Sequence, residues 1–212
     1  MKSHTWMCTP AVCLVAALAM PIGMVGQDNE AEHHKQRHHT YKLIDLGTFG
    51  GPNSFVNGPL VPNISDSGTY AEGAETSIPD PYAPNCEDGD CLVVHAQRWR
   101  NGVVTDLGTL PGTHLSSGAN WVSASGIIVG GSENGLIDPL LGVPENRGVI
   151  WTRNGKIINL GTLEGGNESF AAAVNNRGQV VGWAANTIPD PFSMGCIFVC
   201  FTTQTRGFPG LR

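Results

Sequence analysis

The internal repetition of one short segment constrains this chain more than any other feature. Residues 151–163 read W-T-R-N-G-K-I-I-N-L-G-T-L, and residues 99–110 repeat this pattern with one residue fewer before the turn. A third copy of the D/N-L-G-T core begins at Asp45. The cores start at residues 45, 106 and 159, so the spacing is 61 and then 53 residues. Such spacing lies at or just above the periods that indicate a solenoid, a propeller or another repeat array.

Each repeat has the pattern of short antiparallel strands. Within 151–183, apolar runs alternate with turn residues, and no helical periodicity of useful length is present. Asn154-Gly155 favours a tight hairpin turn because both residues tolerate a positive φ. A second turn is predicted around Gly178, followed by the apolar run 179–181. The sequence therefore predicts an all-β fold made of tandem four-stranded antiparallel units.

The repeats divide residues 41–212 into units of about 41–94, 95–146 and 147–204, with the truncated start of a further unit at 205–212. Four strands form one blade of a β-propeller, and a closed ring needs at least four blades. About three are visible, so we expect a propeller-like array that is an incomplete ring, the chain being a fragment of a longer repeat protein. An open stack is the alternative. Exposed blade edges predict self-association.

The N-terminal 26 residues predict a secretory signal peptide. One lysine precedes an apolar run at 11–20, and polar sequence starts abruptly at Gln27. The run is shorter than a membrane span requires, although an uncleaved anchor is the alternative. We therefore expect an extracellular or periplasmic protein with no membrane span in the mature chain.

Cysteine usage agrees with export. Outside the signal, the four cysteines form two close pairs, Cys86/Cys91 and Cys196/Cys200. An even number in local pairs predicts disulfides in an oxidising compartment. The net charge of −6 disfavours a nucleic-acid partner, which would require a basic face.

Two segments contain residue types that could bind a metal ion. The polar linker 27–40 carries four histidines within 33–39, which could hold a metal ion or could form a solvated tail. Glu87, Asp88 and Asp90 lie between two cysteines and could bind calcium through oxygen atoms. They lack the length and the terminal glutamate of a calcium loop, so a solvated acidic turn is the preferred interpretation. No cofactor is expected.

Three related loops leave the units at the same place. Residues 76–82 and 186–192 are near copies, and 137–140 is a shorter relative. Prolines on both sides of an aspartate interrupt a sheet ladder, so these segments are predicted to be rigid loops on one rim. Insertions at one place of a repeat often form its binding face. The candidate binding residues are Asp80, Tyr82, Asp138, Asp190 and Phe192.

Other recurring positions have a structural interpretation. Asp45 and Asp106 are replaced by Asn159 in the third copy, and an amide cannot replace a general acid or base. A side-chain acceptor for a nearby backbone N–H can be replaced in this way. The remaining structural positions are Trp99 and Trp151 in the strand core, with Gly178 and Gly182. Trp121 and Trp183 either face a sugar or cover a blade edge.

The combined pattern resembles the HAF-repeat family of bacterial extracellular repeat proteins. The matching segments are H-A-Q-R-W at 95–99, D-L-G-T-L at 106–110, G-G at 165–166, F-A-A-A-V-N-N-R-G at 170–178 and Q-V-V-G at 179–182. The first copy departs from the pattern, with Glu72 where the others have Gly130 or Gly182. The resemblance implies secretion and a propeller-like array, and it implies no activity.

Two function classes follow. The first is a secreted binding or surface-interaction module that uses its inter-repeat loops on an extracellular carbohydrate or protein. The alternative is a secreted hydrolase or lyase that gathers Asp80, Asp138 and Asp190 at a propeller rim. No nucleophile elbow, phosphate loop or zinc-protease helix is present in the sequence, so no catalytic residue is assigned.

Overall fold

The fold consists of strands alone in the part of the chain that the computed structural model describes, residues 40–55, 63–84, 86, 89–139, 142–190 and 203–210. The chain divides into two units, Met1–Lys42 and Leu43–Arg212, and every described strand lies in the second. The predicted signal peptide and almost all of the predicted linker lie outside the described residues. No helix among the described residues is long and apolar enough to cross a membrane.

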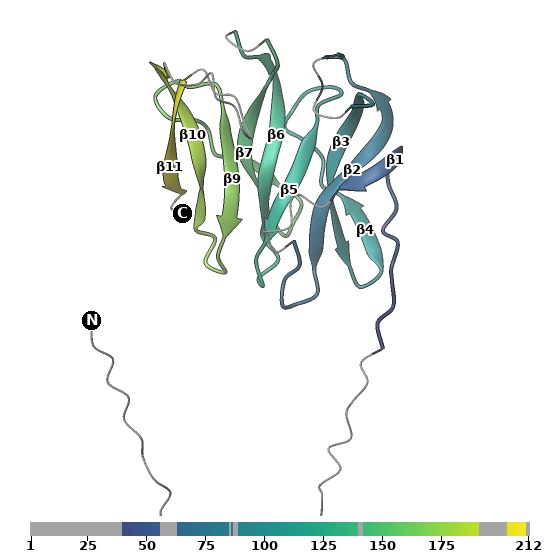
Figure 1. Cartoon of the computed structure of the whole chain (residues 1–212). Helices are drawn as coiled ribbons and strands as arrows, with labels where there is room; N and C mark the ends of the chain where they lie inside the picture. The colour runs from purple at the N-terminus through teal and green to yellow at the C-terminus, as the bar shows by residue number, and fades with distance from the viewer. Residues whose placement is uncertain are drawn as a thin grey trace, which may run out of the picture. The chain divides into compact units, whose positions relative to one another are not determined.

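The described residues contain eleven strands in three antiparallel sheets, which Figure 1 shows in chain order from right to left. The first sheet contains β1 (Gly50–Phe55), β2 (Tyr70–Pro79), β3 (Leu92–Arg100) and β4 (Val103–Asp106). The second contains β5 (Ser117–Val122), β6 (Ile128–Ile137), β7 (Pro144–Trp151) and β8 (Ile157–Asn159). The third contains β9 (Ser169–Val174), β10 (Val180–Pro189) and β11 (Thr203–Gly210). Each sheet follows chain order, as expected for an antiparallel meander.

Asn101-Gly102 and Asn154-Gly155 form the predicted hairpins, but with different turns. Asn101 and Gly102 both have positive φ, 50° and 83°, between the paired residues Arg100 and Val103. This is the two-residue primed turn that matches strand twist. At 152–156 the extra residue lengthens the loop, and Gly155 has a positive φ while Asn154 does not. The one-residue insertion visible in the sequence therefore changes the turn type and preserves the β7–β8 pairing.

The turn between the first and second strands is closed by the same polar contact in every sheet. The side-chain oxygen of Ser65, Ser123 or Asn175 accepts a hydrogen bond from the N–H four residues later, at 3.0–3.1 Å. The glycine three residues after this side chain (Gly68, Gly126 or Gly178) donates its N–H to the backbone carbonyl of the same residue. The serine-to-asparagine exchange leaves the turn intact because each side chain supplies an oxygen at the same place.

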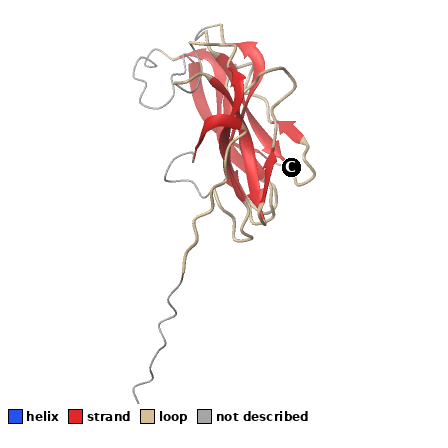
Figure 2. Ribbon diagram, turned by 90° about the vertical axis from the view of Figure 1, so that its right-hand side faces the viewer, coloured by secondary structure: helices blue, strands red, loops and turns tan. Residues whose placement is uncertain are grey.

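The sheets pack face to face, with two apolar cores between them. Ala71 and Ala96 of the first sheet meet Val149 and Trp151 of the second. Val129 of the second sheet meets apolar residues of the third, which are Ala171, Val174 and Val180. Figure 2 shows the sheets from the side, with all their strands in red. Each inner sheet face is thus covered by the next sheet in the chain.

Two buried serines join consecutive sheets through hydrogen bonds. Ser117 Oγ accepts from the N–H of Ala96 and donates to the carbonyl of Gly108, both at 2.9 Å. Ser169 Oγ accepts from the N–H of Gly148 at 2.9 Å and donates to the carbonyl of Gly161 at 2.6 Å. Each serine therefore satisfies one backbone group in the preceding sheet and one in the segment directly after it, which would otherwise be buried without partners.

The sheets of the structure and the repeat units of the sequence have different boundaries. The prediction that every unit has four strands holds for two sheets, while the described residues of the third form three. The first repeat lacks its leading hairpin strand in the sequence, yet the first sheet is complete with four strands. The reason is that the D/N-L-G-T segment begins at the last residue of a fourth strand, Asp106 in β4 or Asn159 in β8. The preceding hairpin strand, with His95 and Trp99, therefore belongs to the first sheet. The described residues form no closed ring.

Candidate functional site

The bulged ends of β2, β6 and β10 carry the most regular surface feature of the fold. Pairing with the neighbouring third strand shifts register between Glu75 and Pro79, between Glu133 and Ile137, and between Ala185 and Pro189. These three irregularities occur at one equivalent place, immediately before the loops. A bulge re-aims side chains at the end of a strand, so the same redirection recurs three times.

A polar side chain fixes the backbone at each bulge. Thr76 accepts a hydrogen bond from the N–H of Ile78 at 3.1 Å. In the second sheet Asn134 accepts from the N–H of Leu136 at 2.8 Å. In the third sheet the pair is Asn186 and Ile188, at 2.9 Å. Each contact spans two residues and holds the following aliphatic residue in place.

These aliphatic residues, Ile78, Leu136 and Ile188, form what we call the aliphatic row. Leu136 is 58% exposed and Ile188 is 43% exposed, while Ile78 is half-buried. Face-to-face sheets typically lie about 10 Å apart, and each of the three sheets carries one member of the row. The row lies at the end of the sheets where the second and third strands are connected, the upper end in Figure 1.

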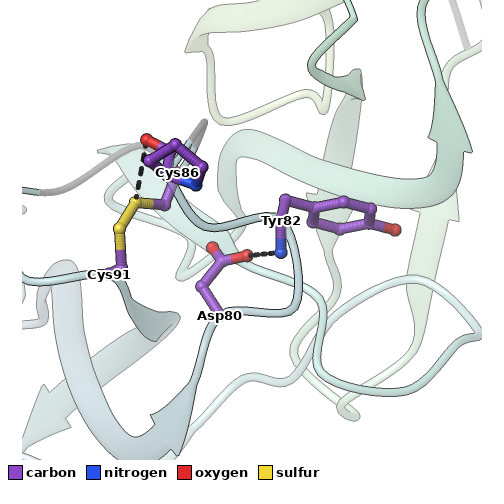
Figure 3. The surroundings of a disulfide bond; sticks show 5 residues. Asp80, Tyr82, Cys86 and Cys91 are labelled. Atoms are coloured by element: carbon purple, nitrogen blue, oxygen red, sulfur yellow. Dashed lines mark hydrogen bonds between the residues drawn. A yellow bond between two sulfur atoms is a disulfide. The ribbon is translucent and has the colours of Figure 1, made fainter.

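The aspartates predicted for binding lie inside the loops. Asp80 and Asp138 are each only 4% exposed. Asp80 Oδ1 accepts from the N–H of Tyr82 at 2.8 Å, as Figure 3 shows. The N–H of Asp138 donates to the carbonyl of Val143, and its carbonyl accepts from Gly142. The structure therefore places two of the three aspartates in loop-forming positions, whereas Phe192 lies outside the described residues.

The first loop is closed by the predicted Cys86–Cys91 disulfide, whose Cα atoms are 5.4 Å apart. Figure 3 shows the disulfide beside the Asp80 turn, with the ring of Tyr82 directed away from it. The N–H of Asp80 also donates to the carbonyl of Cys91, so both ends of the loop are fixed. The second predicted pair, Cys196 and Cys200, lies outside the described residues.

Buried carboxylates lie near these loops, between the second and third sheets. Glu145 pairs with Arg147 at 2.6 Å and also accepts from Asn134 at 2.9 Å. Glu168 accepts from the N–H of Asn146 at 2.9 Å. Burial raises the pKa of Glu168 to about 7, and the nearby charge of Asp138 adds to this effect. The hydrogen bond from Asn146 opposes the shift without cancelling it.

No group of histidine, cysteine and acidic side chains suited to a metal ion is present in the described part of the chain. Two of the three acids considered for calcium, Glu87 and Asp88, lie outside it. The described member, Asp90, accepts a hydrogen bond from the side chain of Asn53 at 3.5 Å.

The outer face of the first sheet holds a second polar group, beside an open groove of about 430 Å³. Tyr70 donates to Glu72 at 2.7 Å, and the amide of Gln97 donates to the other oxygen of Glu72. Burial raises the pKa of Glu72, and the two hydrogen bonds only partly offset it. Trp99 and Ile64 also line the groove. No sheet covers this face among the described residues, which explains why Trp99 is half-buried while the equivalent Trp151 is 1% exposed.

The three D/N positions share one local contact. Asp45, Asp106 and Asn159 each accept a hydrogen bond from the N–H two residues later, at 2.7–2.9 Å. This is the role expected of a position that takes either a carboxylate or an amide. Asp106 makes an additional contact with His95 Nδ1 at 2.9 Å. Burial would raise the pKa of Asp106, but the hydrogen bonds from His95 and Gly108 outweigh burial and hold it below its usual range.

The remaining aromatic residues have structural surroundings. Trp183 stacks on Phe170 with ring centroids 5.7 Å apart, and Trp121 packs beside the core between the second and third sheets.

Sequence reasoning missed the aliphatic row and the two bridging serines. The sequence signal for the row is a recurring Thr/Asn-x-Ile/Leu whose last residue lies two positions before each Asp-Pro. The sequence interpretation assigned binding to the aspartates instead.

No protein-family model matches this chain, and searches of curated proteins and of solved structures found no significant match.

Proposed function

We propose that this chain is a secreted β-repeat protein that binds an extended extracellular ligand, a carbohydrate or a protein segment, along the aliphatic row. The three sheets are, in this proposal, consecutive blades of a propeller-like array of the HAF-repeat kind. Their chain-ordered stacking and their shared turns support that interpretation. The proposal differs from the sequence-based expectation in one respect, because the aliphatic residues replace the aspartates as the main contacts.

One observation carries the proposal. In three successive sheets, a side-chain hydrogen bond fixes the backbone N–H of an aliphatic residue at the rim. Folding gains less from Leu136 and Ile188 than from a core residue, because they remain 58% and 43% exposed. Fixing them in advance lowers the entropy lost on binding. A regular row of such residues suits a ligand that is itself extended and has contact points about 10 Å apart.

The proposed location outside the cytoplasm rests on the N-terminal 26 residues and on the disulfide of the first loop. An oxidising compartment favours such a bond. Mass spectrometry of the protein from its native host should find cleavage before about residue 30. An intact Met1 end in a cytoplasmic fraction would contradict export.

Binding to a panel of soluble and insoluble polysaccharides and of extended peptides tests the function. The double substitution Leu136→Ser/Ile188→Ser should weaken the best panel interaction by at least about tenfold. The matched control is Val103→Ser/Val104→Ser, which alters two exposed valines at the opposite end of the sheets. Equal binding by both variants, or no wild-type binding to any panel member, would contradict the proposal.

The hydrolase or lyase alternative would need the loop aspartates as acids or bases. Asp80 and Asp138 are buried and hydrogen-bonded within their own loops, which favours a structural role. The double substitution Asp80→Asn/Asp190→Asn distinguishes the two functions. Loss of turnover on the same panel, with folding intact, would establish the enzyme instead.

A further inference from the structure

A basic hollow lies between the second and third sheets, at the end opposite the loops. Antiparallel strands place alternate connections at opposite ends of a sheet. The loops connect β2 to β3 and β6 to β7, whereas this hollow is bordered by the β7–β8 turn and the β9–β10 turn. Its volume is about 710 Å³, so it is larger than the groove on the first sheet.

Three cations and no acid line the hollow. They are Arg153 and Lys156 from the β7–β8 turn, and Arg177 from the β9–β10 turn. Their side chains are exposed, and none forms an ion pair with another described residue. The chain as a whole has a net charge of −6. The hollow is therefore locally positive although the whole chain is negatively charged. A bound anion would reduce the repulsion among the three cations.

The two turns that carry these cations are rigid. Thr152 Oγ1 accepts from the N–H of Lys156 at 3.0 Å and donates to Asn154 Oδ1 at 2.6 Å. The N–H of Arg177 donates to Asn175 Oδ1 at 2.9 Å. Asn176 Oδ1 accepts from the N–H of Ser125 at 3.1 Å, which joins the β9–β10 turn to the β5–β6 turn of the second sheet. The backbone positions of the cations are thus set before any ligand arrives.

The floor of the hollow is apolar. Ile127, Ile150 and Ile158 line the hollow together with the cations. Ile127 and Ile150 also pack against the core between the second and third sheets. A simple inorganic anion would leave this surface in water, whereas an organic anion would cover it and gain from its burial.

We propose that this hollow binds a small organic anion that joins a sulfonate, phosphate or carboxylate group to an apolar body. Arg153, Lys156 and Arg177 contact the charged group, and the three isoleucines contact the apolar body. The site is independent of the aliphatic row, because it lies at the other end of the sheets and uses different residues.

Three probes separate the two parts of the proposed ligand. 2-Naphthalenesulfonate has both the charge and the apolar body, 2-naphthol has only the body, and inorganic sulfate has only the charge. Calorimetry on the full chain should show the tightest binding for 2-naphthalenesulfonate, at least about tenfold tighter than for either other probe. Its affinity should fall as salt concentration rises, because the contact is electrostatic and solvent-accessible.

Variants locate the binding. Arg153→Gln/Arg177→Gln should weaken 2-naphthalenesulfonate by at least about tenfold, and Arg100→Gln, an exposed arginine outside the hollow, should leave it unchanged. Thermal melts of both variants check that the fold is retained. Amide chemical-shift changes should concentrate in the turns at 152–156 and 175–179. Absence of sulfonate binding at millimolar concentration, equal binding of naphthol or sulfate, or binding insensitive to the double substitution would each overturn the proposal.

Discussion

The backbone N–H of Asn146, in the second sheet, donates a 2.9 Å hydrogen bond to Oε2 of Glu168, which directly precedes the third sheet. At the equivalent place between the first two sheets, the N–H of Val94 donates to Ser116 Oγ at 3.2 Å. A carboxylate in one interface and a hydroxyl in the other thus play the same role, because each accepts a hydrogen bond from a backbone N–H of the preceding sheet. The carboxylate adds a titratable group to a buried contact, since Glu168 is only 6% exposed.

Replacing Glu168 should change how stability depends on pH. Its pKa is about 7 in the folded protein, compared with 4.5 ordinarily, so the folded state holds this proton more tightly than the unfolded state. The resulting stabilisation is complete below the ordinary pKa and is lost as the pH rises through about 7. Glu168→Gln removes this dependence. The difference in unfolding free energy between wild type and variant should change by about 2–3 kcal/mol across this interval.

Urea unfolding of both proteins at a series of pH values measures the effect. The variant should be the more stable protein at mildly alkaline pH, where the wild-type carboxyl is charged and buried. Parallel stability curves for wild type and variant would show that Glu168 does not titrate in this range.

Removing one bridging serine should weaken the contact between sheets. Ser169→Ala leaves the N–H of Gly148 and the carbonyl of Gly161 without their partner, and an unsatisfied buried group costs about 1–3 kcal/mol. Ser77→Ala, at an exposed serine, should change stability by less than about 0.5 kcal/mol. Chemical denaturation of both variants gives the comparison. A loss at Ser169 no larger than at Ser77 would argue against the bridging role.

A methyl group at Gly182 should be poorly tolerated. A Cβ atom there would lie 2.0 Å from the carbonyl oxygen of Phe170 in the neighbouring strand. Gly182→Ala should therefore destabilise the protein by about 1–3 kcal/mol or more. Gly207→Ala is the control, because the nearest atom to its Cβ is 3.8 Å away. Similar melting temperatures for the two variants would contradict the close approach.

Two substitutions at Asp106 separate its local turn from its charge. Asp106→Asn keeps the acceptor for the N–H of Gly108, as Asn159 does in the next repeat, whereas Asp106→Ala removes it. At neutral pH the alanine variant should be less stable than the asparagine variant by about 1 kcal/mol. The hydrogen bonds from His95 and Gly108 lower the pKa of Asp106, so the stabilisation they give its ionised carboxylate is lost as the pH falls through that lowered pKa. Identical melts for the two variants at neutral pH would exclude the acceptor role.

The sequence alone determined the local structure. Asn101-Gly102 and Asn154-Gly155 specified hairpins because a positive φ is tolerated by few residue types. The exchange of Asp106 for Asn159 indicated a backbone acceptor, because only a contact that both side chains make survives it. The Cys86–Cys91 pair was predicted from its short spacing. Each of these features depends on a few neighbouring residues, so a linear pattern is sufficient to reveal it.

Only the tertiary structure decided which surfaces are buried and which are available. Trp99 and Trp151 occupy the same place in the repeat, but a preceding sheet covers only Trp151. The aliphatic row and the basic hollow arise where successive sheets bring equivalent or distant residues side by side. Burial depends on what another part of the chain places over a residue. The identities of the residue's own neighbours in sequence carry little of that information.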